Sequence, residues 1–318
     1  MSTLEAVRET CARVAEVAEH VHINRDVMPE YVEKVAAATP ITGLDPDFHY
    51  LQGSDEDKAT FVIVLDTINF GSGWFPVINK GQASSGYFKI AGSLKEWFRR
   101  YGVPTATRLR SLTREECCAI FGQQGNSKAI DLMQLFASAL NDLGDEIEQH
   151  FEGSFAALVE AANGSADALV DLLSAMPLFA DMAMYKGDKI FFYKRAQITA
   201  SDLDLAFGGE GLGAFTDIYT LTCFADNLVP HVLRADGVLS YTSKLLQRIN
   251  REELIPAGSQ EEIEIRACAV TAVEWISECS GQAGAALPPR LIDNILWEKG
   301  QGPAYKAHPR HRTLTTFY

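Results

Sequence analysis

The stretch KAIDLMQLFASALNDLGDEIEQHF, residues 128–151, decides the fold class of this chain. Its apolar residues recur at steps of three and four, which is the period of an amphipathic helix with one face turned to a core. We therefore predict one long helix over 128–151. The inward-facing positions of this helix would be Leu132, Leu135, Phe136, Ala139, Leu140 and Leu143.

The same period recurs on both sides of that stretch, together with signals that start a helix. A Ser or Thr followed three residues later by Glu satisfies free backbone N–H groups at a helix start. Such pairs are Ser2 with Glu5, Thr113 with Glu116 and Ser259 with Glu262. Further helices are expected over 28–38, 166–176 and 290–297. The pattern predicts a mainly α chain that forms a single compact domain over residues 1–318.

Two apolar stretches do not fit a simple helical pattern. FVIVL at 61–65 and KIFFY at 189–193 are rich in β-branched or aromatic residues, which favour strands. Neither has enough strand-like sequence nearby to build a sheet of ordinary size. We therefore expect buried helices or a minor hairpin, and at most a minor β element in the fold.

Composition limits the partners. The 318 residues include 28 Lys and Arg against 42 Asp and Glu, which gives a formal net charge of −14. General DNA or RNA binding is disfavoured, because neutralised phosphates supply most of that affinity. A small phosphorylated ligand needs only a few cations and stays compatible. The chain has no apolar run of about 18 residues and no secretory signal at its start, so we expect no membrane partner and a cytoplasmic location.

The six cysteines form no C-x-x-C pair and lie mostly in apolar helical stretches. This pattern is typical of buried reduced thiols rather than of a zinc site or disulfides, so no metal site is predicted. The chain also lacks the P-loop, the dinucleotide-binding glycine motif, G-x-S-x-G and H-E-x-x-H. ATP hydrolysis, nicotinamide redox chemistry, esterase and zinc protease activities therefore lose their main support.

The first candidate site follows the apolar run at 61–65. Asp66 and Asn69 must find hydrogen-bond partners if they are buried, and the aromatic residues Phe70 and Trp74 follow them. These residues could form a pocket wall that pairs with a planar base and stacks on it. Alternatively, this is a plain helix end with Gly71 as a left-handed cap and Asp66 satisfied internally.

Two further candidates carry charge in apolar surroundings. Lys194 and Arg195 follow an aromatic pair, which suits a phosphate or carboxylate partner, although a solvated pair of cations would look the same. Asp226 lies among apolar neighbours, where partial desolvation raises a carboxyl pKa unless a cation compensates. Such groups are frequent in active sites, but structural ion pairs give the same pattern.

The segment 306–318 is basic and ends in Phe317-Tyr318, which is unusual for a disordered tail. It could fold back over a site, or it could be an ordinary mobile end. An isolated histidine such as His49 is more often structural than catalytic. The candidates for contact with a phosphate or ribose are His49, Arg195, Arg310, His311 and Arg312.

An ordered set of short motifs, from about residue 45 to the end, resembles the queuosine salvage protein family, whose members are queuosine 5′-phosphate N-glycosylase/hydrolases. After Phe70, the segment 71–74 looks like a bacterial variant of that family. The matching motifs are LDTINF at 65–70, KRAQ at 194–197, TCFAD at 222–226, VP at 229–230, GVL at 237–239, EIEIR at 262–266 and HRT at 311–313 with the closing Tyr318.

The resemblance implies a helical fold similar to helix-hairpin-helix DNA glycosylases, and a catalytic pair formed by Asp226 and Lys194. The implied reaction is hydrolysis of queuosine 5′-monophosphate to queuine and ribose 5-phosphate, with no metal or organic cofactor and no polynucleotide. Asp226 would stabilise the oxocarbenium-like transition state. Asp66 and Asn69 would hold the polar edge of the base, while Lys194 could keep Asp226 ionised, hold the phosphate or donate a proton.

Two other functions stay open from the sequence. A helix-hairpin-helix DNA glycosylase would share the fold and an aspartate but would need a basic face. A non-catalytic carrier of a modified base would share the pocket without turnover.

Overall fold

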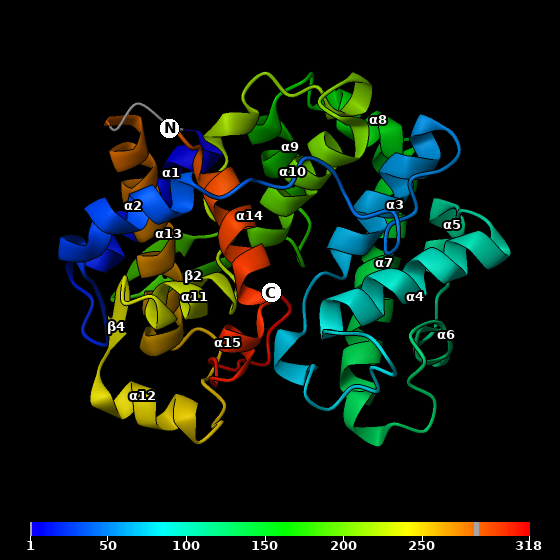
Figure 1. Cartoon of the computed structure of the whole chain (residues 1–318). Coiled ribbons are helices and arrows are strands. Elements are labelled where there is room, and N and C mark those ends of the chain that lie inside the picture. The colour runs from blue at the N-terminus through cyan, green and yellow to red at the C-terminus, as the bar shows by residue number, and fades with distance from the viewer. Residues whose placement is uncertain (1, 283–285) are drawn as a thin grey trace.

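The computed structural model describes residues 2–282 and 286–318, and its architecture is mainly helical (Figure 1). The helices are α1 (Thr3–Glu16), α2 (Met28–Ala36), α3 (Asp55–Thr67), α4 (Gly86–Tyr101), α5 (Ala106–Arg110), α6 (Arg114–Ile120), α7 (Ile130–His150), α8 (Phe155–Ala161), α9 (Ala166–Ser174), α10 (Lys194–Phe207), α11 (Val229–Ala235), α12 (Ser243–Asn250), α13 (Gln260–Gln282), α14 (Pro289–Gly300) and α15 (Pro303–Lys306). The strands are β1 (Val21–Ile23), β2 (Met182–Tyr185), β3 (Asp188–Phe191) and β4 (Leu239–Tyr241).

The buried apolar side chains form two clusters. One gathers around α3 to α10, and the other around α1, α2, α11, α13 and α14. Figure 1 shows this division, with the first and last helices of the chain on one side, α3 to α8 on the other, and the C-terminal residues between them. Tyr193 packs against both clusters. The start of α10 therefore lies where the two halves meet.

The long helix predicted over 128–151 is confirmed as α7, preceded by a single 3-10 turn. Five of its six predicted inward residues are buried, and Leu135 is half-buried. Gly144 allows α5 to pack closely, because a Cβ there would stand 2.6 Å from the carbonyl oxygen of Ala106. The first cluster is thus organised along this helix.

The predicted helix starts are also observed. Ser2 with Glu5 and Thr113 with Glu116 form complete capping boxes at α1 and α6. At the start of α13 the Ser259 hydroxyl accepts a hydrogen bond from the Glu262 backbone N–H at 3.4 Å. The helices expected over 28–38, 166–176 and 290–297 are present as α2, α9 and α14.

The two ambiguous stretches adopt the two expected alternatives. Residues 61–65 lie inside α3 and are buried on every face, which explains why they show no amphipathic period. Residues 188–191 form β3, which pairs antiparallel with β2 in a small hairpin. Strands β1 and β4 form a second two-stranded sheet. The predictions of a mainly α fold and of a minor β element are confirmed.

Two further features concern the cysteines and the hydropathy of the helices. All six cysteines lie within the described residues and are free thiols. Within residues 2–282 and 286–318, no helix is long and apolar enough to span a bilayer.

Candidate active site

A cavity of about 390 Å³ lies at the junction of the two halves. It is lined by α4, α10 and α14, by the loops that follow α3 and precede α11, and by the C-terminal segment. Six residues singled out from the sequence line it together, although they are far apart in the chain. These six are His49, Asn69, Phe70, Lys194, Asp226 and Arg310.

Lys194 is the first residue of α10. The residue before it, Tyr193, has a left-handed backbone with φ of 49°, so the chain turns sharply into the helix. The backbone N–H of Lys194 donates to Asp181 Oδ2 at 3.1 Å, and its Nζ donates to the carbonyl oxygen of Asn69 at 3.1 Å. Burial lowers the pKa of Lys194, while the carboxylate of Asp226 opposes that shift. Lys194 is therefore a buried amine held among carboxyl groups.

Asp226 is half-buried and is oriented by the start of α11. Its Oδ1 accepts hydrogen bonds from the backbone N–H groups of Leu228 at 2.7 Å and Val229 at 3.0 Å. An aspartate oxygen that accepts from the N–H groups two and three residues later forms an Asx turn, which restricts the rotation of the side chain. One carboxylate oxygen is thus fixed by the backbone, which leaves Oδ2 for chemistry in the cavity.

Arg266 on α13 joins the segments that carry both of these residues. Its guanidinium donates to Asp181 Oδ1 at 2.9 Å and Oδ2 at 2.6 Å, and its Nε donates to the carbonyl oxygen of Ala225 at 2.9 Å. Asp181 in turn accepts the Lys194 N–H, and Ala225 precedes Asp226. Burial opposes the charge, yet Asp181 raises the pKa of Arg266. The sequence marked this residue only as part of a family motif.

Two aspartates that the sequence analysis did not single out also line the cavity. Asp293 on α14 accepts hydrogen bonds at Oδ1 from the Phe224 N–H at 2.9 Å and the Cys223 Sγ at 3.2 Å. Burial and then Asp226 raise the pKa of Asp293 to about 7. Burial and the neighbouring Asp66 raise the pKa of Asp202 on α10 well above its ordinary value. The cavity is therefore rich in carboxyl groups around one lysine.

Asp66 lies behind the cavity wall rather than on it. It is fully buried, and its Oδ1 accepts from Asn69 Nδ2 at 3.2 Å, while Oδ2 has no partner among the described residues. Burial raises the pKa of Asp66 to about 7. Gly71 does have a left-handed backbone, with φ of 95°. Asp66, however, is only half satisfied, and it orients the Asn69 amide that lines the cavity.

Arg195 points away from the cavity although it is next to Lys194. Successive residues on a helix point about 100° apart, so one side chain enters the cavity and the other enters the core. The Arg195 guanidinium donates to the carbonyl oxygen of Thr67 and lies 4.9 Å from the ring centroid of Phe70 and 4.8 Å from that of Phe179. Burial lowers the pKa of Arg195 to about 9.

The C-terminal segment folds back over the site. This is one of the two alternatives that the sequence left open for it. Tyr318 is buried, lines the cavity and accepts the Gly71 N–H at its carbonyl oxygen at 3.0 Å. His311 Nε2 lies 3.3 Å from the Tyr318 hydroxyl, and Arg312 donates to the carbonyl oxygen of Gly73 at 3.1 Å. His311, Arg312 and Trp74 are not among the residues that line the cavity.

The C-terminal segment also contributes cationic side chains to the cavity lining. Arg310 is half-buried, and burial lowers its pKa while Asp226 opposes that shift. Lys80 and Lys306 also line the cavity. His49 uses both ring nitrogens, at 2.7 Å from the Asp45 carbonyl oxygen and 2.8 Å from the Tyr87 hydroxyl, and burial lowers its pKa.

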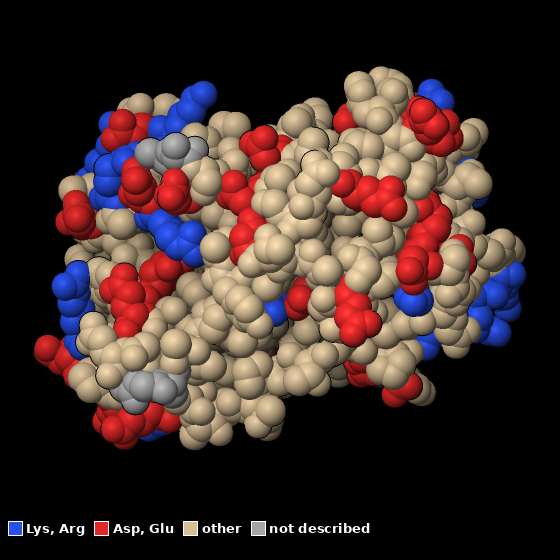
Figure 2. Space-filling model, turned by 90° about the horizontal axis from the view of Figure 1, so that it is seen from above, with Lys and Arg blue, Asp and Glu red and all other residues tan. Residues whose placement is uncertain are grey.

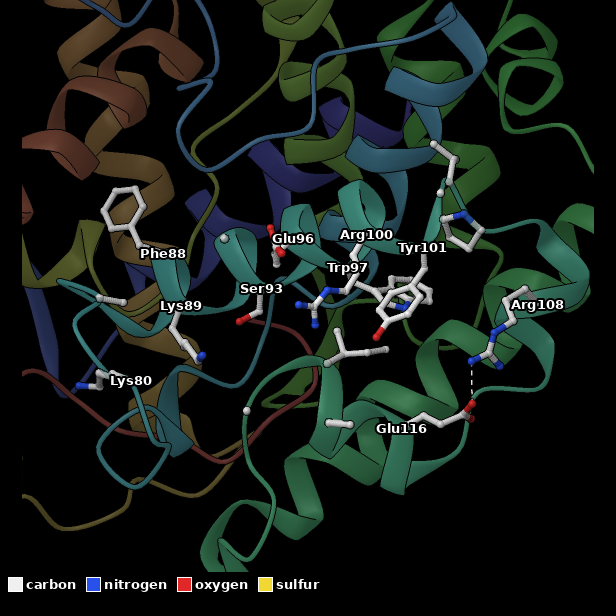
Figure 3. A pocket seen from close by; sticks show the side chains of 18 of the residues that line it. Lys80, Phe88, Lys89, Ser93, Glu96, Trp97, Arg100, Tyr101, Arg108 and Glu116 are labelled. Atoms are coloured by element: carbon white, nitrogen blue, oxygen red, sulfur yellow. Dashed lines mark hydrogen bonds and ion pairs between the residues drawn. The ribbon is translucent and has the colours of Figure 1, made fainter.

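A second, larger cavity of about 1010 Å³ lies on the outer side of α4. Figure 3 shows Lys80 and Lys89 toward one end of it, and the ion pair between Arg108 and Glu116 toward the other, at 2.6 Å. Neither Lys194 nor Asp226 lines it. Among the described residues, no group of three or more His, Cys, Asp or Glu side chains is placed to hold a metal ion. The smaller cavity is therefore the candidate active site.

Comparisons with known proteins show the family of the chain. A family model described as "Queuosine salvage protein" matches residues 48–318. Three relatives carry the name queuosine 5′-phosphate N-glycosylase/hydrolase. That of Sphaerobacter thermophilus is 40% identical over 98% of this chain and 97% of its own. That of Dictyostelium discoideum is 34% identical over 100% of both chains. That of Bos taurus is 30% identical over 84% of this chain and 83% of its own. The resemblance inferred from the motifs is confirmed, and the chain belongs to the queuosine salvage protein family.

Proposed function

We propose that this protein is an N-glycosyl hydrolase that converts queuosine 5′-monophosphate and water to queuine and ribose 5-phosphate, and so supplies queuine for salvage. The observation that carries the proposal is that Asp226 and Lys194 line the same cavity, in a chain whose family members bear that activity in their names. A pocket of this size is suited to a mononucleotide.

Asp226 is the proposed catalytic carboxylate. Cleavage of an N-glycosidic bond passes through a sugar cation at C1′, by analogy with sugar hydrolysis. Asp226 Oδ1 is held by two backbone N–H groups, so Oδ2 is the atom that stabilises this cation and orients or deprotonates the attacking water. Because the carboxylate is already held in place, no free energy is lost in orienting it when the transition state forms.

Lys194 is the proposed partner of Asp226. Its buried Nζ is fixed on the Asn69 carbonyl oxygen, and the carboxylates of Asp226 and Asp66 favour its charged form. A buried cation among several carboxyl groups keeps one of them ionised. The leaving base is a 7-deazaguanine, which lacks the N7 that many purine cleavages protonate. Leaving-group help must therefore reach the ring elsewhere, and the Lys194 ammonium is a donor within the cavity.

The remaining proposed contacts are those to the base and those to the 5′-phosphate. Phe70 offers a ring for stacking, and Asn69, oriented by Asp66, offers polar atoms to the base. Arg310 is the proposed main contact of the 5′-phosphate, with Lys80 and Lys306 beside it. For the other residues that the sequence suggested, we propose a structural role in or behind the cavity walls. These are His49, Trp74, Arg195, His311 and Arg312.

The surface charge, the fold and the cysteines bear on the rival functions and on the location of the protein. On the face shown in Figure 2, acidic side chains are widely spread and the Lys and Arg residues form no continuous band. This supports a nucleotide rather than duplex DNA as the substrate. We further propose that the fold resembles helix-hairpin-helix DNA glycosylases, which a superposition with such enzymes tests. The free cysteines support a cytoplasmic location.

The test is a chromatographic assay of purified protein with queuosine 5′-monophosphate and no added metal. Many equivalents of queuine and ribose 5-phosphate, released in equal amounts, support the hydrolase. Retention of one equivalent of intact nucleotide per chain, with neither queuine nor ribose 5-phosphate formed, contradicts it and favours the carrier. Tight binding of duplex DNA at low salt favours the DNA glycosylase.

A further inference from the structure

Two buried polar side chains, on two different helices, line the cavity. Asp202 on α10 is 8% exposed and Asn294 on α14 is 9% exposed, and both line the cavity. Burial has the largest influence on the Asp202 carboxyl group and raises its pKa, and Asn294 Nδ2 is buried without a partner among the described residues. Unpaired buried polar groups are costly and rare. Their presence on one cavity indicates a ligand that supplies the missing partners.

Asp202 marks the end of the cavity that is distant from the catalytic pair. Lys194, Ile198 and Asp202 follow each other at four-residue steps, so they share one face of α10. Asp202 stands about 12 Å beyond Lys194 along the helix axis. Its Cβ tilts toward the helix start, back along the cavity. A base attached to a sugar at Lys194 and Asp226 would extend its far edge toward Asp202.

Asn294 is brought to the same end by an ion pair one turn before it. Arg290 on α14 lies 2.8 Å from Asp204 Oδ2 and donates to Ser201 Oγ at 3.5 Å. These two residues flank Asp202 on α10, so α14 is fixed beside it. Asn294 follows Arg290 by four residues and shares its face of α14. A carboxyl acceptor from one helix and an amide donor from the other therefore meet at this end.

The two groups match one type of heterocycle edge. A carboxylate offers two acceptor oxygens, and a primary amide nitrogen offers donors. The pairing edge of a guanine-type base presents a carbonyl oxygen followed by two N–H donors, whereas an adenine-type base presents an amino donor beside a ring acceptor. We propose that Asp202 accepts the two N–H groups of a guanine-type base and that Asn294 Nδ2 donates to its carbonyl oxygen. This inference rests on the proposed function and names its specificity-determining residues.

Two other buried acidic groups near the cavity, Asp66 and Asp293, each have one carboxyl oxygen engaged elsewhere. Asp66 does not line the cavity, and its Oδ1 is bound to Asn69. Asp293 Oδ1 is bound to the Phe224 N–H. Burial raises the pKa of Asp202, so its ionised form is unfavourable until two N–H donors stabilise it.

The test uses free bases and the isosteric variant Asp202→Asn, which replaces an acceptor oxygen by a donor. Calorimetry measures the binding of 7-deazaguanine, 7-deazaadenine and ribose 5-phosphate. We expect the wild-type protein to prefer 7-deazaguanine over 7-deazaadenine. In the variant we expect the affinity for 7-deazaguanine to fall roughly ten- to hundredfold, with unchanged affinity for ribose 5-phosphate. Asp142→Asn on α7, outside the cavity, is the matched control and should bind all three as the wild type does.

A second variant covers the case in which Asp202→Asn fails to fold. Asn294→Leu keeps a similar volume and removes the donor, so it should also weaken 7-deazaguanine binding while ribose 5-phosphate binding persists. Wild-type affinity for 7-deazaguanine in either folded variant overturns the inference, as does equal binding of the two bases by the wild-type protein. Failure of the proposed function looks different, because selective base binding would persist without any release of queuine from queuosine 5′-monophosphate.

Discussion

Replacement of Arg266 by Met tests whether one buried guanidinium positions both catalytic residues. Arg266 makes two hydrogen bonds to Asp181 and one to the Ala225 carbonyl oxygen, and both members of the ion pair are 2% exposed. Removal of one partner from a buried pair costs about 3–5 kcal/mol, since the other charge stays buried and uncompensated. We expect Arg266→Met to lower the free energy of unfolding by that amount.

The effect on catalysis should exceed the effect on binding. Asp181 holds the N–H of Lys194, and Ala225 adjoins Asp226, so loss of Arg266 loosens both ends of the catalytic pair. A displacement of about 1 Å can cost a hundredfold in rate. We therefore expect kcat to fall by about that factor, while the KM for queuosine 5′-monophosphate changes much less.

The assays are urea unfolding and steady-state kinetics on Arg266→Met, Asp181→Asn and the double variant. The double variant should be less destabilised than the sum of the two single variants, because the two groups act on each other. The exposed pair of Arg99 and Glu96 gives the control, for which Arg99→Met should cost below about 1 kcal/mol. A loss in Arg266→Met as small as that of the control, with unchanged kcat, would refute the positioning role.

Three further outcomes are expected. Burial raises the pKa of Asp66 from 3.8 to about 7. Its contribution to the free energy of unfolding is therefore complete below pH 3.8 and falls by about 4 kcal/mol as the pH rises to 7. Asp66→Asn should remove this part of the pH dependence from urea unfolding measured between pH 4 and 8. Arg310→Gln should raise the KM for queuosine 5′-monophosphate about tenfold or more, because a charged hydrogen bond is lost. The KM for queuosine, which has no phosphate, should stay unchanged. Equal effects on both substrates would contradict the assignment of Arg310 to the phosphate site. We also propose that residues 1–318 form one domain, for which calorimetry should show one unfolding transition, and two separated transitions would contradict it.

The sequence predicted most of the helical framework, because helical periods and capping boxes are local signals. The residues of α7 face a single core, so its inward positions could be read from their spacing. Residues 61–65 are buried on every face, and such a segment carries no period. Its apolar β-branched residues could therefore not separate a helix from a strand.

The site was harder to predict than the framework. Lys194 and Arg195 are neighbours with the same charge, and only the rotation of α10 places the first in the cavity and the second in the core. Asp202 and Asp293 look like ordinary surface acids in the sequence, since nothing local shows that α10 and α14 bury them together. Asp202 follows Lys194 by two four-residue steps. This spacing was a signal for Asp202 once Lys194 had been chosen.

The most direct test of the proposed chemistry compares Asp226→Asn with the wild-type protein in a single-turnover reaction. The amide keeps the shape of the carboxylate and can still accept the Leu228 and Val229 N–H groups at its oxygen, but it cannot stabilise the sugar cation. We predict that the variant still binds queuosine 5′-monophosphate in calorimetry. The activation free energy of queuine release should rise by several kcal/mol, so the rate should fall at least about a thousandfold. Near-normal queuine release by a variant that still binds the nucleotide would contradict the assignment of Asp226 as the catalytic carboxylate.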